Sequence, residues 1–415
     1  MAQTYIGASI RRTEDFRLVT GTGSYVDDIK IPGVLHAAIL RSPHGHARIK
    51  SIDTAKAVNV PGVVAVFTYA DLAPSIKPIP IRMVPLPGLE RYLQYPLASG
   101  IVRYVGEPVA IVVAESRYLA EDALDAIEVM YEPLAAVVNV KESLKNEVVI
   151  HQDSGTNLAA SYTVSRGDVE EAFNKADYTS KEEFKVHRHT GNPMETRGLV
   201  ASYDPHTEDL TVWGPTKVPH FNRRVLSSLL DMPVERVHFI EPDVGGGFGV
   251  RGEFYPEDFL IPFSATKLRR PVKWIEDRRE HLMVTNHSRE MLFEVEVAAQ
   301  RDGTILGIRA KIFADIGAYS RPHGGLVPTH AAKWLPGPFR VPDYHCEVYL
   351  VVTNKNGIGT YRAPAPMNHA SPANGCWTWS LRTSSLTRGR SASRTSFSHR
   401  KCPTMQEPWT RPKSR

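Results

Sequence analysis

Apolar and polar positions alternate along this chain in short blocks, a pattern that predicts many strands and few helices. Apolar residues spaced by three and four predict two helices, at 116–131 with Ser116 as its N-cap and at 218–230. Strand-like runs occur at 34–40, 107–115, 200–203, 210–213, 237–240, 272–275 and 292–297, with longer ones near 304–320 and 345–353. Strands mixed with a few helices indicate an α+β fold.

Turn residues and changes of composition divide the chain into five predicted segments. The predicted segments are an irregular N-terminal arm at 1–17, a first α+β domain at 18–135, a linker at 136–165, a second strand-rich domain at 166–364 and a tail at 365–415. The tail keeps no helical or strand periodicity, which is typical of disorder.

The net charge of +5 comes from the tail alone. Residues 365–415 hold nine Lys or Arg and one Glu, so the rest of the chain has 41 basic and 44 acidic residues. A nucleic-acid-binding face needs basic residues clustered on a folded surface. We therefore do not expect nucleic acid as a partner.

Cysteine and apolar content exclude further classes. Cys346, Cys376 and Cys402 lie late in the chain and form no CxxC pair, so we expect no zinc site and no iron–sulfur cluster held by the chain itself. No run approaches the ~18 apolar residues of a membrane span, and the start has no apolar signal-peptide core. The expected location is the cytoplasm.

His187 and His189 alternate at strand spacing and so share a face. Together with Glu195 they could suggest a metal site, but no further ligand accompanies them. A turn stabilised by Glu195 and Arg197 is the favoured interpretation, and we assign no metal ligand.

A glycine-rich stretch, Asp243–Gly252, follows the strand predicted at 237–240. Glycines let a backbone approach a ligand closely, and their N–H groups can face oxygen atoms. Residues 247–252 also match G-x-G-x-x-G, yet that fingerprint should open a helix, whereas here Glu253 to Pro256 follow. We therefore favour a cofactor loop other than a dinucleotide site, and a tight core turn is the structural alternative.

The stretch Gly359–Pro364 carries Arg362, whose guanidinium could pair with an anionic ligand. The alternative is an ordinary surface arginine.

Three sets of residues, in the same order along the chain, resemble the "hammerhead" domain that opens the large subunits of molybdenum hydroxylases. These enzymes form the family of xanthine dehydrogenase, aldehyde oxidase and aerobic carbon monoxide dehydrogenase. The three sets lie within 18–70, at 104–109 (YVGEPV) and at 129–134 (VMYEPL). The resemblance makes 18–135 a hammerhead domain with a packing role, and 166–364 an incomplete first molybdopterin-binding domain.

The resemblance also implies a cofactor site. Backbone amides around Phe248 would face the oxo ligand of a molybdenum held by molybdopterin, in its plain or cytosine dinucleotide form. The implied cofactor-binding residues are Gly246, Gly247, Phe248, Gly249, Arg362 and His189, the last near a glutamine of the family. No cysteine lies close to Arg362, which disfavours the copper-dependent carbon monoxide dehydrogenases.

The implied function is an oxidoreductase subunit that hydroxylates or oxidises an aldehyde, a purine or an N-heterocycle. The implied partners are an iron–sulfur subunit and an FAD subunit, in a dimer of heterotrimers. The family's catalytic glutamate falls beyond residue 415, so we assign no catalytic residue and expect this chain alone to be inactive. A non-catalytic binding or assembly protein built from the same domains is the alternative.

The tail from about residue 365 has the properties of a sequence read out of frame. In the alternative frame, a codon consists of the third base of one codon and the first two bases of the next. For several residue pairs this shifted codon specifies a single amino acid whatever codons were used: Leu for Cys376–Trp377, Asp for Trp377–Thr378 and Trp409–Thr410, and Ala for Met405–Gln406. Permitted codons then let 373–388 encode an amphipathic helix. We interpret the tail as the product of a frameshift.

This interpretation predicts the gene sequence. DNA sequencing around codons 362–372 and downstream should show an open alternative frame that encodes the continuing family pattern. Stop codons in that frame would contradict the frameshift.

Overall fold

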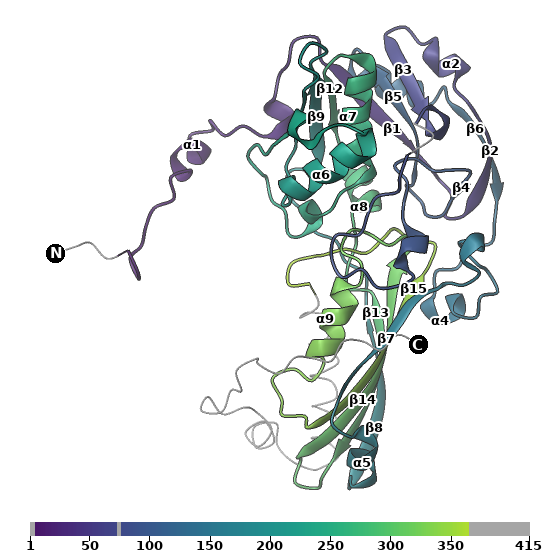
Figure 1. The fold of residues 1–415 in the computed structure, drawn as a ribbon, viewed down its shortest axis with the longest axis vertical. Coiled ribbons are helices and arrows are strands. Elements are labelled where there is room, and N and C mark those ends of the chain that lie inside the picture. Colours follow the sequence, from purple (N-terminus) through teal and green to yellow (C-terminus); the bar gives the residue numbers. More distant parts are fainter. Residues whose placement is uncertain (1–4, 73–75, 365–415) are drawn as a thin grey trace.

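The computed structural model describes residues 5–72 and 76–364, and the predicted tail lies outside them. The described residues form a seven-stranded, a five-stranded and a three-stranded sheet with helices packed on them, as the sequence predicted for an α+β protein. In Figure 1 the long five-stranded sheet extends away from the lobe that holds the other two sheets.

The seven-stranded sheet joins the two segments that the sequence analysis treated as separate domains. Leu35 pairs with Val272 in the parallel contact of β1 with β12. This contact spans two residue pairs, too few to leave a sequence signal. The strand order is β11 (Val237–Ile240), β10 (Leu210–Trp213), β9 (Gly198–Tyr203), β12 (Val272–Ile275), β1 (Leu35–Arg41), β5 (Pro108–Ala114) and β3 (Val63–Thr68).

A small sheet completes the first segment, in the order β4 (Ile101–Val102), β2 (Ala47–Asp53) and β6 (Glu128–Pro133), with α2 (Ala55–Val58) and α3 (Arg117–Leu124) nearby. The side chain of Ser116 caps α3 by accepting a hydrogen bond from Leu119 N (3.3 Å), as predicted. The helix predicted at 116–131 was too long, because residues 128–133 pair with β2 instead. Tertiary pairing here overrides the helical spacing.

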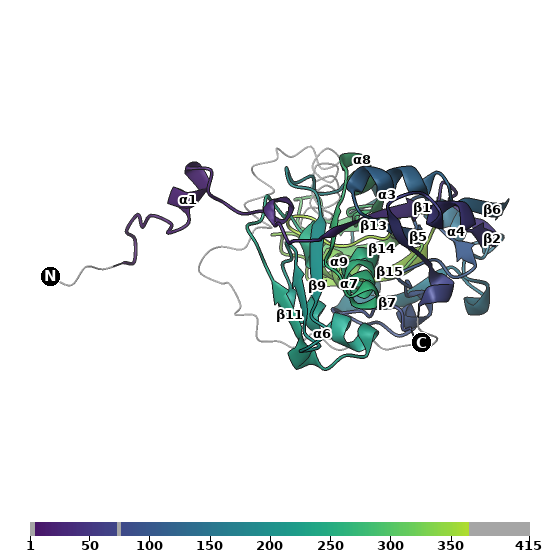
Figure 2. The ribbon, with the colours of Figure 1, turned by 90° about the horizontal axis from the view of Figure 1, so that it is seen from above.

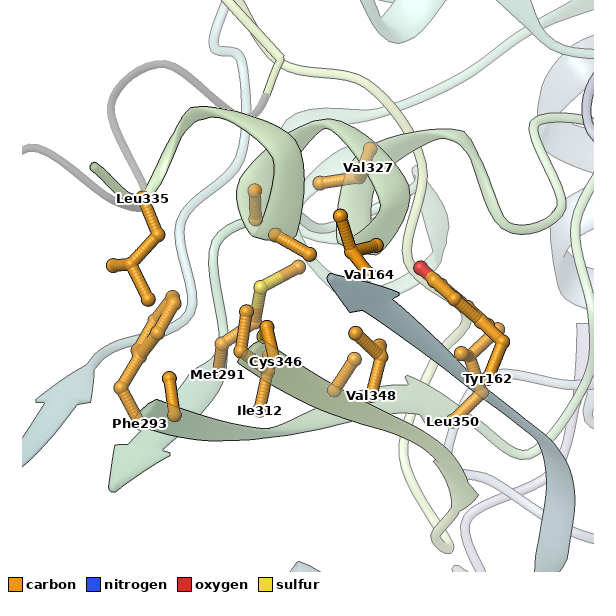
Figure 3. Close-up of a cluster of buried hydrophobic side chains, with 14 of the residues drawn as sticks. Tyr162, Val164, Met291, Phe293, Ile312, Val327, Leu335, Cys346, Val348 and Leu350 are labelled. Carbon is orange, nitrogen blue, oxygen red and sulfur yellow. The ribbon is translucent and has the colours of Figure 1, made fainter. Parts of the chain in front are cut away.

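The five-stranded sheet runs in the order β7 (Leu158–Arg166), β15 (Asp343–Val352), β14 (Ile305–Gly317), β13 (Met291–Ala299) and β8 (Tyr178–Val186). Its inner face packs against α9 (Leu326–Trp334), and Figure 3 shows the side chains between them. Phe293, Ile312 and Cys346 are fully buried there. The predicted linker at 136–165 is shorter than expected, because it contains α4 (Val140–Ser143) and β7 begins within it.

Helices α5 (Val169–Asn174), α6 (Pro219–Leu230), α7 (Pro256–Leu268) and α8 (Arg278–Val284) complete the core. The prediction at 218–230 is confirmed by α6. The sequence did not predict α7, because most of its residues are buried and no polar face marks the helical period. Proline at its first position suits a helix start.

The N-terminal arm extends away from the body in both views, and α1 (Asp15–Val19) lies within it (Figures 1 and 2). The arm joins the body where Ser24 N donates to Asp243 Oδ2 (2.7 Å). Short 3₁₀ turns lie at Val26–Asp28, Tyr69–Asp71, Leu89–Tyr92, Gln152–Ser154, Val234–Arg236 and Val250–Gly252.

The core of the five-stranded sheet predicts a stability difference between two phenylalanines. Phe293→Ala should lower the free energy of unfolding by about 3–5 kcal/mol, since it leaves a cavity in a closed core. Phe16→Ala, at a side chain that is 77% exposed, should change it by less than about 0.5 kcal/mol. Urea unfolding followed by circular dichroism measures both, and equal losses would contradict this assignment of the core.

Candidate cofactor site

The glycine-rich loop leaves β11 and turns back on itself before α7. Its backbone takes positive φ angles at Gly246 (105°), Phe248 (49°) and Gly249 (113°). Glycine adopts such angles freely, but for Phe248 the left-handed region costs about 1–3 kcal/mol. Strain of this kind is found preferentially at ligand-binding sites.

The loop lies so close to neighbouring backbone that glycine is required. A Cβ added at Gly249 would overlap the carbonyl oxygen of Thr360, and one at Gly245 would overlap Glu195 Cβ. Arg362 N donates to Phe248 O (2.6 Å), which fixes the loop against residues 359–364. The structure therefore brings together two stretches that the sequence analysis selected separately.

A buried ion pair holds the loop on its inner side. Arg251 Nη2 donates to Glu195 Oε2 (3.0 Å), and the same oxygen accepts from Gly245 N (2.8 Å). Arg251 Nε also donates to Gly246 O (3.2 Å). Burial lowers the pKa of Arg251, and its Nη1 is buried with no hydrogen-bond partner in the described part of the chain.

The backbone around Arg362 wraps a second arginine. Arg289 donates from Nη1 to Ala363 O (2.8 Å) and from Nη2 to the carbonyls of Tyr361 (3.3 Å) and Arg362. Its guanidinium carbon lies 5.0 Å from the centre of the Tyr361 ring. These contacts fix the backbone at Arg362 while its side chain stays exposed.

A pocket of about 860 Å³ opens over the loop. Its lining includes four of the six predicted residues: Gly247, Phe248, Gly249 and Arg362. Gly246 lies in the same loop but not in the lining. The lining also contains side chains that the sequence analysis did not select, namely the charged Arg82, Lys217, Glu241 and Arg251 and the imidazole of His323.

The pocket fits an anionic ligand with oxygen acceptors. No acceptor among residues 5–72 and 76–364 takes the backbone N–H groups of residues 246–249. Basic side chains outnumber the one carboxylate, Glu241. Unpaired amides beside cationic groups are what the phosphate and oxo oxygens of a pterin-held metal would require. The residues present therefore fit such a group.

Below the loop, a buried ionic network connects both segments of the chain. Arg197 donates to Glu257 (2.9 Å) and Glu276 (3.0 Å), and Arg41 of β1 donates to Glu257 (2.7 Å). Burial alone would raise the pKa of Glu257, but Arg197 and Arg41 lower it to about 2. The network reaches the loop region through His281, whose Nε2 lies 3.0 Å from Gly191 O.

The histidine face lies apart from the pocket. His187 and His189 are both exposed, as strand alternation predicted, and His189 pairs by its backbone with Ser288 (3.0 and 2.7 Å). His189 is not in the pocket lining, so its role stays a prediction. Glu195 and Arg197 both make buried polar contacts, as the turn interpretation expected, but with the glycine loop and α7. Within the described ranges no three His, Cys, Asp or Glu side chains could hold a metal ion.

One argument against dinucleotide binding was wrong in detail. The loop does lead into a helix, α7, between the strands β11 and β12. Since β10 and β12 are both antiparallel to β9, and β11 is parallel to β10, these strands run in one direction. However, the first turn of α7 is already taken up by the protein's own carboxylates: Glu257 is buried against Arg197 and Arg41, and Asp258 accepts from Tyr255 N. The pocket lining contains no residue of α7.

The fold and the pocket thus define a cofactor-binding protein of the α+β class. The chain belongs to the molybdopterin-binding family of the aldehyde oxidases and xanthine dehydrogenases. Residues 150–371 match the molybdopterin cofactor-binding domain, and residues 20–135 match the aldehyde oxidase and xanthine dehydrogenase a/b hammerhead domain. The family and fold predicted from the sequence motifs are confirmed.

Known proteins similar to this chain agree with this family. Subunit gamma of the 6-hydroxypseudooxynicotine dehydrogenase complex of Paenarthrobacter nicotinovorans is 38% identical, over 87% of this chain and 46% of that protein. The carbon monoxide dehydrogenase large chain of Afipia carboxidovorans is 37% identical, over 85% and 45%. The structure of quinoline 2-oxidoreductase from Pseudomonas putida 86 superposes with a TM-score of 0.90 at 35% identity, over 95% of this chain and 50% of that one.

The chain spans about half the length of these relatives. Within the described residues no helix is long and apolar enough to cross a membrane.

The close approach at Gly249 predicts a difference between two glycine variants. Gly249→Ala should destabilise the protein by about 1–3 kcal/mol more than Gly100→Ala, because the new Cβ meets backbone only at residue 249. Both glycines have positive φ, 113° at Gly249 and 73° at Gly100, so Gly100→Ala controls for part of the backbone strain. Thermal unfolding measures the difference, and matching melting temperatures would refute the close contact.

Proposed function

We propose that this chain binds a molybdenum–molybdopterin cofactor in the pocket above Phe248, as part of a molybdenum hydroxylase large subunit. The observation that carries the proposal is the set of backbone N–H groups at residues 247–249, which have no acceptor in the described part of the chain and lie with Arg362 in a cationic pocket. The match of residues 150–371 to a molybdopterin-binding domain supports it.

Different residues of the chain would bind different groups of the cofactor. The N–H groups near Phe248 would donate to oxygen atoms of the ligand, and the strained loop keeps them in place without reorganisation. The Arg362 guanidinium would pair with an anionic group. His189 would contribute from the stretch before Glu195.

A bound molybdenum–pterin group supplies the two-electron redox chemistry, while the protein supplies binding and orientation. For the full-length protein we propose hydroxylation or oxidation of an aldehyde, a purine or an N-heterocycle. Its partners would be an iron–sulfur subunit and an FAD subunit, in a dimer of heterotrimers, and the cytosine dinucleotide form of the cofactor is included in the proposal. The cytoplasm is the proposed location.

The amount of cofactor that the purified chain retains tests the proposal directly. The full chain, expressed in a host that makes molybdopterin, should retain pterin, measured as the fluorescent oxidation product after denaturation, and molybdenum, measured by mass spectrometry. Arg362→Met should reduce the retained pterin about tenfold or more, since a charge-assisted hydrogen bond is lost.

Arg301→Met is the matched control, because Arg301 lies in the exposed turn between β13 and β14. It should retain as much pterin as the unmodified chain. Absence of pterin from the unmodified, folded chain would count against the proposed function, as would equal retention in both variants.

A further inference from the structure

A segment of the first region reaches across to the pocket. Arg82 N and Met83 N both donate to Pro322 O (2.7 and 3.0 Å), and Gly325 N donates to Val84 O (3.1 Å). These backbone bonds fix the crossing and place Arg82 and Met83 in the pocket lining. The region for which the sequence resemblance implied packing alone therefore contributes side chains to the candidate site.

Arg82 has no carboxylate partner there. In the described part of the chain, no acidic oxygen lies within ion-pair distance of it, and its Nε is buried without a hydrogen-bond partner. Its Nη2 makes only long bonds, to Gly252 O and His323 Nε2 (both 3.3 Å). Its guanidinium carbon lies 5.5 Å from the centre of the Phe221 ring. Charged side chains are rarely buried unless they are paired, so the guanidinium of Arg82, partly buried and without a carboxylate among the described residues, is suited to pair with an anion.

His323 orients this guanidinium. Arginine can only donate, so His323 Nε2 must accept from Arg82 Nη2. The ring proton then lies on Nδ1, which donates to the buried carboxylate of Glu253. The side-chain oxygen Thr360 Oγ1, two residues before Arg362, lies 3.2 Å from the same Nε2. The Glu253–His323 pair thus sets the position of Arg82 relative to the cofactor loop.

The pocket as a whole has unbalanced charge. Arg251 is paired with Glu195, but Arg82, Lys217 and Arg362 have no carboxylate partner in the ranges that the structure describes. Glu241 is the one acidic side chain in the lining. The unpaired basic groups come from both segments of the chain, so a ligand that neutralises them would contact both.

We propose that Arg82, positioned by Glu253 and His323, binds an anionic group of the ligand in this pocket. The group is a phosphate or a carboxylate, and it would come from the cofactor or from the substrate. The inference rests on the proposed function and adds a binding residue from the hammerhead region to it.

The test uses the full chain with two probes, inorganic pyrophosphate and benzoate, each titrated by isothermal calorimetry. Arg82→Met should weaken binding of at least one probe about tenfold, because it removes the charge and keeps the length of the side chain. Arg82→Lys should recover part of the affinity, since it restores the charge without the planar fork. Arg91→Met, at an exposed arginine of the same segment, is the control and should bind as the unmodified chain does.

Weakened pyrophosphate binding assigns Arg82 to a phosphate of the cofactor, and weakened benzoate binding alone assigns it to a carboxylate of the substrate. Unchanged binding of both probes by Arg82→Met, with unchanged circular dichroism, would overturn the inference, as would a chain that binds neither probe. After either result, the proposed function still stands if the unmodified chain retains pterin and the Arg362→Met variant loses it. Loss of pterin from the unmodified chain would instead remove the proposed function.

Discussion

The site depends on the buried ion pairs that the guanidinium of Arg197 makes. This guanidinium lies between Glu257 and Glu276 and packs 4.0 Å from the centre of the Tyr255 ring. Each of these buried charges costs several kcal/mol to desolvate, so the arrangement is stable only when every partner is in place. Since Arg41 shares Glu257, the network also ties β1 to α7. The position of the glycine loop therefore follows from contacts made below it.

Two further features turn this rigid base into a binding surface. Glu195 and Arg251 hold the inner side of the loop by hydrogen bonds, and Arg289 does the same for the backbone at Arg362. Arg251 and Arg289 thus make their contacts within the protein, whereas the lining residues Arg82, Lys217 and Arg362 have no carboxylate partner in the described part of the chain. Arginine thus serves both to hold the loop and to line the pocket, and the two roles differ only in the partners of the side chain.

Much of the fold was predictable because its strands are regular. The strands predicted at 210–213, 237–240 and 272–275 have those bounds in the structure. Helix α7 was missed because burial on all sides removes the polar face on which a periodic pattern depends.

The site was predictable only where it is local in sequence. Phe248 and Arg362 lie in recognisable stretches, and the structure brings both to one pocket. Arg82 and His323 come from stretches with no pattern of their own, and only the backbone bonds to Pro322 bring them there.

The pairing of β1 with β12 has a consequence for synthesis on the ribosome. The edge of β1 that pairs with β12 has no partner until Val272 has left the exit tunnel, although β5 covers the other edge far earlier. Likewise, β7 waits for β15. Late pairing of early strands slows folding and leaves open edges that attract other chains. The nascent polypeptide would therefore keep unpaired strand edges until nearly all of its described residues had emerged.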